Sequence, residues 1–102
     1  MSIWVCGEVL IDVLPTGPVV GGGPANTAKA LARLGYAVDF IDGISSDAYG
    51  VSARKELEHD GVGLSLALSS EKPTCTETVT LDSAGSASYE FLIDGTATFD
   101  FN

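Results

Sequence analysis

A glycine-rich corner carries the residues best suited to binding chemistry in this sequence of 102 residues. The corner reads GGGPAN over residues 21–26, and Asp12 lies upstream of it. Successive glycines let backbone N–H groups approach a ligand without obstruction by Cβ atoms, while the Asn26 amide can both donate and accept hydrogen bonds. Asp12 adds a carboxylate acceptor. Such an array suits the hydroxyl groups of a polyol, because each hydroxyl needs a donor and an acceptor.

Two phosphate-binding motifs do not fit the same corner. A P-loop requires a lysine directly after its last glycine, and a dinucleotide fingerprint requires a third glycine where this chain has Asn26. One structural alternative stays open on spacing alone. In that alternative the glycines only pack a helix against the preceding strand, and Asn26 acts as a local cap.

No other cluster indicates catalysis or metal binding. Cys6 and Cys75 are far apart and belong to no CxxC or Cys/His pattern, so neither a zinc site nor a redox pair is predicted. His59 falls near the end of a predicted helix, where the helix dipole favours a surface imidazolium. The other carboxylates that could act as a base all fall in turns or at helix ends, where Asp is common as a cap: Asp47, Asp60, Asp94 and Asp100.

Charge limits the possible partners. Fourteen acidic residues against five basic ones give a net charge of −9, which repels nucleic acid and anionic membrane surfaces. We therefore predict neither nucleic-acid nor membrane partners. The N-terminus lacks the basic region of a signal peptide, and Glu8 and Asp12 interrupt its apolar run. With two unpatterned cysteines, these features favour a cytoplasmic protein.

The elements that must position the corner alternate between strand and helix. Residues 3–14 predict a strand that breaks at Gly7 and continues as a second extended segment, with both faces buried and Trp4 in the core. Residues 16–24 read as a loop. A helix follows from Pro24 to Gly35, then a strand over residues 37–41, a loop, and a second helix with Asp47 as its N-cap.

The C-terminal part has a different pattern. The segment GLSLAL, residues 63–68, predicts a third core strand. Residues 76–81 and 88–93 alternate in polarity around a turn-rich loop, which predicts an antiparallel hairpin with Tyr89, Phe91 and Ile93 on one face. We expect an α/β fold: a partial core of parallel strands and helices with an antiparallel β flap.

Five segments together resemble the ribokinase-like (PfkB) carbohydrate kinases over essentially the whole chain. They are GEVLIDVLP, GGGPANTAKALARLG, DGISSDAYG, EHDGV and CTETVTLDSAGSASYEF. The second resembles the first signature of the family, and the last resembles its lid strands. Gly23-Pro24 in place of the ribokinase-type Lys-Gly leans toward fructokinase-like or 2-keto-3-deoxygluconate kinase-like members.

The resemblance implies a sugar site and a lid. In such kinases Asp12, Gly21, Gly22 and Asn26 would hold sugar hydroxyls, and Phe91 would cover the ring. Residues 1–102 would form one N-terminal segment, with an α/β core over about residues 1–70 that also contributes to the lid, and a lid hairpin over about residues 74–94.

The resemblance also implies ATP and Mg as cofactors and a phosphoryl transfer to a sugar hydroxyl. The G-A-G-D segment that supplies the base and the anion hole in this family does not occur in these residues. We therefore expect no catalytic residue here, and a segment that is inactive alone. A homo-oligomer joined through lid strands is expected, because the sheet would otherwise keep an open edge. The alternative function is a non-catalytic dimerising or interaction module that retains the kinase half-fold.

Overall fold

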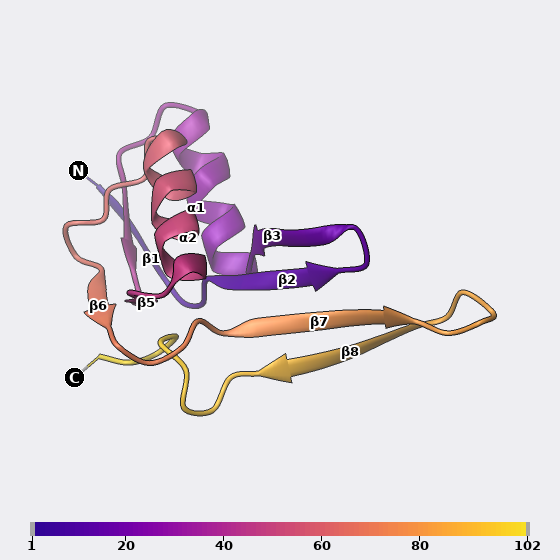
Figure 1. Ribbon diagram of the computed structural model, residues 1–102. Coiled ribbons are helices and arrows are strands. Elements are labelled where there is room, and N and C mark those ends of the chain that lie inside the picture. Colours follow the sequence, from indigo (N-terminus) through magenta and orange to yellow (C-terminus); the bar gives the residue numbers. More distant parts are fainter. Residues whose placement is uncertain (1, 102) are drawn as a thin grey trace.

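The computed structural model describes residues 2–101, which form an α/β core and a sheet that projects from it (Figure 1). In chain order the elements are β1 (Ile3–Cys6), β2 (Leu10–Leu14), β3 (Gly17–Gly21), α1 (Gly23–Arg33), β4 (Val38–Ile41), β5 (Gly43–Ser45), α2 (Ala48–His59), β6 (Leu68–Ser70), β7 (Thr76–Leu81) and β8 (Ala87–Leu92). No helix among these residues has the length and apolarity that a membrane crossing requires.

The core strands are parallel, as the sequence predicts. β1 pairs with β4, and β5 pairs with β6. Only Asp42 separates β4 from β5, so the two follow one path, with β1 beside its first half and β6 beside its second. The prediction of a strand over residues 63–68 is wrong. Gly63 forms a single bridge to Asp39, and the strand begins only at Leu68.

Both helices pack on the same side of these strands (Figure 1). Small side chains on α1 and α2 let the helices approach Phe40, which is fully buried at the centre of the core: Ala25, Ala28 and Ala53. Ion pairs join the helices along their outer surfaces. Lys29 Nζ lies 2.5 Å from Glu56 and Arg33 lies 2.7 Å from Asp60.

The helix ends follow the predicted signals. Pro24 lies in the first turn of α1, and Gly35 follows that helix with a φ of 97°. Asp47 is the N-cap of α2, where its carboxylate accepts a hydrogen bond of 2.8 Å from the Gly50 N–H. These signals were readable because each depends on one residue type at one helix end.

The other face of the core strands is open, which corrects one expectation. Trp4 was predicted to lie in the core, but 68% of its surface is exposed. Side chains alternate between the two faces of a strand. Because α1 and α2 cover only one of those faces, Trp4 and Cys6 point away from the described core.

The projecting sheet has four strands in the order β3-β2-β7-β8. β7 and β8 form the predicted antiparallel hairpin. Residues 17–21 were predicted to lie in a loop, but they form β3, which pairs antiparallel with β2. Pro18 is compatible with β3 because this strand lies at the sheet edge, where a missing N–H leaves no ladder bond unmade. We call this four-stranded sheet the lid sheet.

Candidate functional site

The β2–β3 hairpin brings Asp12 and Gly21 together. Asp12 lies near the middle of β2, and Gly21 ends β3 just before α1. A Cβ atom built on Gly21 would collide with Oδ2 of Asp12, so the carboxylate lies directly against the Gly21 backbone. Any larger residue at position 21 would displace it. That the two groups bind one ligand stays a prediction.

Gly22 makes the corner between β3 and α1. It is the N-cap of α1 with a φ of 102°, and a Cβ there would lie 2.8 Å from the backbone oxygen of Glu8. Both facts require glycine. No side chain caps this helix end. Pro24 has no N–H, so the donors of the first turn are the Gly23 and Ala25 N–H groups, which can donate hydrogen bonds to a ligand oxygen at the positive end of the helix dipole.

Asn26 lies one turn further along α1. Its backbone N–H donates a 2.9 Å hydrogen bond to the Gly22 carbonyl, and the residue is exposed. It lines a shallow surface depression with Lys29 and Arg33. Since no side chain caps α1, the alternative of Asn26 as a local cap finds no support in the described chain. Its contact with a sugar stays a prediction.

Strand register places Phe91 on the same face of the lid sheet as Asp12. Asp12 is in register with Val19 on one side and with Glu77 on the other, and Glu77 is in register with Phe91. Residues opposite one another on neighbouring strands point to the same face. Phe91 is 52% exposed there, so its ring remains free to contact a ligand.

Glu77 is the residue at this site that the sequence did not single out. The pKa of its carboxyl is raised, first by a hydrogen bond with Asp12, then by burial and by the negative charge of Asp12. The two carboxyl groups are therefore close neighbours. The sequence shows Glu77 only as one member of an alternating strand, because the parallel pairing of β2 with β7 joins segments far apart in the chain.

Three of the four carboxylates considered as possible bases make structural contacts. Asp47 caps α2 and also accepts hydrogen bonds from the Thr74 N–H and hydroxyl at 2.9 and 2.5 Å. Asp60 pairs with Arg33, whose hydrogen bond holds the pKa of that carboxyl below its usual range. Asp100 accepts a 2.7 Å hydrogen bond from the Ser70 hydroxyl. Asp94 is exposed beyond β8.

Asp42 is a buried carboxylate that sequence reasoning overlooked. It accepts hydrogen bonds from the Val9 N–H at 3.2 Å, the Thr98 hydroxyl at 2.6 Å and the Phe99 N–H at 2.7 Å. Burial is the largest influence on this carboxyl and raises its pKa. Asp42 thereby holds Thr98 and Phe99, which follow the lid hairpin in the chain, against the end of β4.

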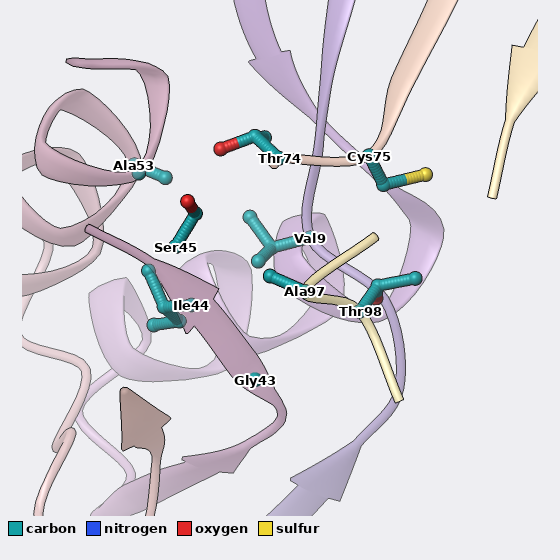
Figure 2. Close-up of a pocket in the computed structure, with 10 residues that line it drawn as sticks. Val9, Gly43, Ile44, Ser45, Ala53, Thr74, Cys75, Ala97 and Thr98 are labelled. Atoms are coloured by element: carbon teal, nitrogen blue, oxygen red, sulfur yellow. The ribbon is translucent and has the colours of Figure 1, made fainter. Parts of the chain in front are cut away.

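A small cavity lies between β5, α2 and the segments that lead into β2 and β7 (Figure 2). Its volume is about 10 Å³, and its lining includes Val9, Ile44, Ser45, Thr74 and Cys75. That volume is at most the space of one water molecule, so the cavity is too small for a sugar. Burial raises the pKa of the Cys75 thiol, which keeps it protonated and unreactive.

Comparison with known proteins identifies the family of this chain. A family model described as pfkB family carbohydrate kinase matches residues 9–102. The chain belongs to this family of carbohydrate kinases. The fructokinase of Klebsiella pneumoniae is 35% identical over 98 residues, which cover 90% of this chain and 32% of that protein. The fructokinase of Rhizobium leguminosarum bv. trifolii is 36% identical over 104 residues, 93% of this chain and 32% of its own length.

Solved structures give the same result. The crystal structure of the Xylella fastidiosa fructokinase with bound ATP superposes with a TM-score of 0.88 at 33% identity, over 98% of this chain and 33% of that one. The chain therefore spans about a third of the length of the relatives that it matches. The partial ribokinase-like α/β fold predicted from the sequence is confirmed.

The described residues do not fit the nucleotide and metal that the family implies. The N-terminus of α2 is capped by the Asp47 carboxylate, and that of α1 follows the Asp12 carboxylate at Gly21. Both positions would repel a triphosphate. Within residues 2–101 no group of three or more His, Cys, Asp or Glu side chains is arranged to hold a metal ion.

Proposed function

We propose that this chain is the sugar-binding and lid portion of an ATP-dependent carbohydrate kinase that phosphorylates an uncharged sugar such as fructose. One observation carries the proposal: the Asp12 carboxylate lies against the Gly21 backbone beside the uncapped N-terminus of α1. A carboxylate acceptor and unpaired N–H donors at one corner match the two needs of a sugar hydroxyl. The substrate follows from the fructokinases that the chain resembles.

In this proposal the lid sheet completes the site. Asp12 accepts hydrogen bonds from one or two sugar hydroxyls, while Gly22 and Asn26 hold others. Phe91, on the same face as Asp12, covers the ring. Closure of the lid would keep water away from the γ-phosphoryl group, for which water competes with the sugar hydroxyl. We assign the reaction to the cytoplasm, in keeping with two free cysteines.

Phosphoryl transfer itself would require groups that these residues do not provide, so we propose that the segment alone binds sugar without phosphorylating it. The base, the anion hole, ATP and Mg belong to the remainder of the family fold. The segment organisation expected from the sequence also remains a proposal: a core over about residues 1–70 that contributes strands to the lid, and a lid hairpin over about residues 74–94.

Thermal unfolding with added sugar tests the function. Fructose should raise the midpoint of unfolding in a concentration-dependent way, because a ligand that binds only the folded state stabilises it. Asp12→Ala should abolish that shift. Glu90→Gln is the matched control, since Glu90 lies on the opposite face of the lid sheet and its loss should leave the shift intact. A shift that persists in Asp12→Ala would refute the assignment of Asp12.

A second function is favoured by one observation. All six residues of β8 are exposed, although this edge strand carries Tyr89, Phe91 and Leu92. An interaction module that uses the lid to bind another protein would expose the same surface. The thermal test separates the two functions, because such a module would respond to no sugar, ketose or sugar acid.

A further inference from the structure

We propose that Glu77 is a specificity-determining residue that makes the site reject sugar acids and accept uncharged sugars. The inference rests on the proposed function and narrows its substrate class. The sequence left fructokinase-like and 2-keto-3-deoxygluconate kinase-like substrates both open. The two classes of substrate differ in charge, because 2-keto-3-deoxygluconate carries a carboxylate and fructose does not.

Register fixes the position of Glu77. It faces Asp12 across the parallel β2–β7 pair and Phe91 across the antiparallel β7–β8 pair. It therefore lies between the hydroxyl-binding carboxylate and the residue proposed to cover the ring, on the same face as both. A bound ligand that contacts both Asp12 and Phe91 must therefore also lie against Glu77.

Glu77 is also near enough to Asp12 to interact with it. The hydrogen bond with Asp12, burial and the charge of Asp12 all raise the pKa of the Glu77 carboxyl. Among residues 2–101 no salt bridge to Lys or Arg neutralises either carboxylate. The two together form a negative surface that accepts hydrogen bonds from hydroxyl groups and repels a ligand carboxylate.

Selectivity in binding tests the inference. The affinities of the chain for fructose and for 2-keto-3-deoxygluconate are measured by calorimetry at low ionic strength and pH 8, above the usual range of a carboxyl. Glu77→Gln keeps the shape and removes the charge. It should improve binding of the sugar acid relative to fructose by about tenfold or more, as expected for the loss of one close like charge. High salt should reduce the difference.

The control is Glu90→Gln, which removes the same charge from the same sheet. Glu90 is in register with Thr78, so it points to the opposite face from Glu77. The ratio of the two affinities should change less than twofold. Glu77→Ala should shift the ratio in the same direction as Glu77→Gln, which covers the case in which glutamine disturbs the strand.

Two failures are distinguishable. An unchanged ratio in both Glu77 variants, with fructose still bound, would overturn the role of Glu77 and leave the proposed function standing. A wild-type chain that binds neither ligand would overturn the proposed function, and the inference with it. An equal shift in Glu90→Gln would show a general charge effect, which also overturns the inference.

Discussion

Asp47 connects two parts of the molecule through one side chain. It caps α2 through the Gly50 N–H and holds the Thr74 backbone and hydroxyl at the base of β7. Burial alone would raise the pKa of this carboxyl, but the hydrogen bonds from Thr74 and Gly50 outweigh burial and lower it. The ionised form is thus the one that stabilises both the helix and the attachment of the lid.

Replacing Asp47 should therefore have an acid-dependent effect. Asp47→Ala should lower the free energy of unfolding by about 2 kcal/mol at pH 7, since it removes a helix cap and leaves the Thr74 hydroxyl unpaired. A lowered folded-state pKa gives stability that is present above the unfolded pKa, near 4, and is lost as pH falls through the folded pKa. Urea unfolding at pH 7 and pH 3 measures both quantities.

Asp47→Asn is the informative companion variant. Asparagine caps helices about as well as aspartate, so this variant should retain most of the free energy of unfolding at pH 7. Because asparagine does not ionise, it should lack the loss of stability that protonation of Asp47 causes at low pH. The pKa of Asp42 is raised in the folded protein, so Asp42 makes the free energy of unfolding depend on pH in the opposite direction to Asp47. Each variant is therefore compared with the wild type at the same pH. An equal loss at both pH values in Asp47→Ala would contradict this account.

At the scale of the elements, α2 contacts β5 through a glycine. Gly50 is buried in the first turn of the helix, and a Cβ there would collide with the Ser45 carbonyl oxygen and lie 2.6 Å from its carbon. The Ser45 backbone cannot easily move away. It is paired with β6, and its hydroxyl donates a 2.6 Å hydrogen bond to the Lys72 carbonyl.

Gly50→Ala should therefore destabilise the protein, although alanine is the better helix former by about 1 kcal/mol. Steric overlap with fixed backbone should dominate and lower the free energy of unfolding by about 2 kcal/mol. Gly23→Ala is the matched control. A Cβ on Gly23 meets open space at the start of α1, so this variant should be neutral or slightly stabilising. Urea unfolding of both variants checks the prediction, and equal stability would contradict it.

The sequence predicted the elements that depend on local signals. Both helices, the break at Gly7 and the β7–β8 hairpin were readable because caps, glycines and alternation act over a few residues. β3 was hidden because glycine and proline surround its two valines. Its stability comes from pairing with β2 rather than from its own composition.

The candidate site was predictable only in part, for the same reason. GGGPAN and Asp12 could be singled out because each residue type has a distinct binding property. That Asp12 lies against Gly21 follows from the β2–β3 hairpin, which the sequence did not predict. Glu77 joins the site through the parallel β2–β7 register, a long-range pairing that local patterns do not encode.

At the scale of the whole molecule, the outer part of the lid sheet projects beyond the two helices (Figure 1), and its β7–β8 hairpin exposes apolar side chains. Register divides the β7–β8 hairpin into two faces. One carries Thr76, Thr78, Thr80, Ser88, Glu90 and Leu92, and the other carries Glu77 and Phe91 near the core and Val79, Leu81, Ala87 and Tyr89 further out. On this second face, 58% of Leu81 and 62% of Tyr89 are exposed. Soluble monomers seldom expose an apolar face beside an open sheet edge.

We predict that two chains pack their lid sheets together through the outer part of this face, around Leu81 and Tyr89, while Glu77 and Phe91 remain beside Asp12 at its inner part. Sedimentation velocity at micromolar concentration should show a dimer. Leu81→Glu should shift it toward the monomer without loss of folding, because a buried charge opposes association while the exposed Leu81 contributes little within one chain. Thr80→Glu places the same charge on the opposite face and should leave the dimer intact. A folded wild-type monomer, or equal dissociation in both variants, would contradict this pairing.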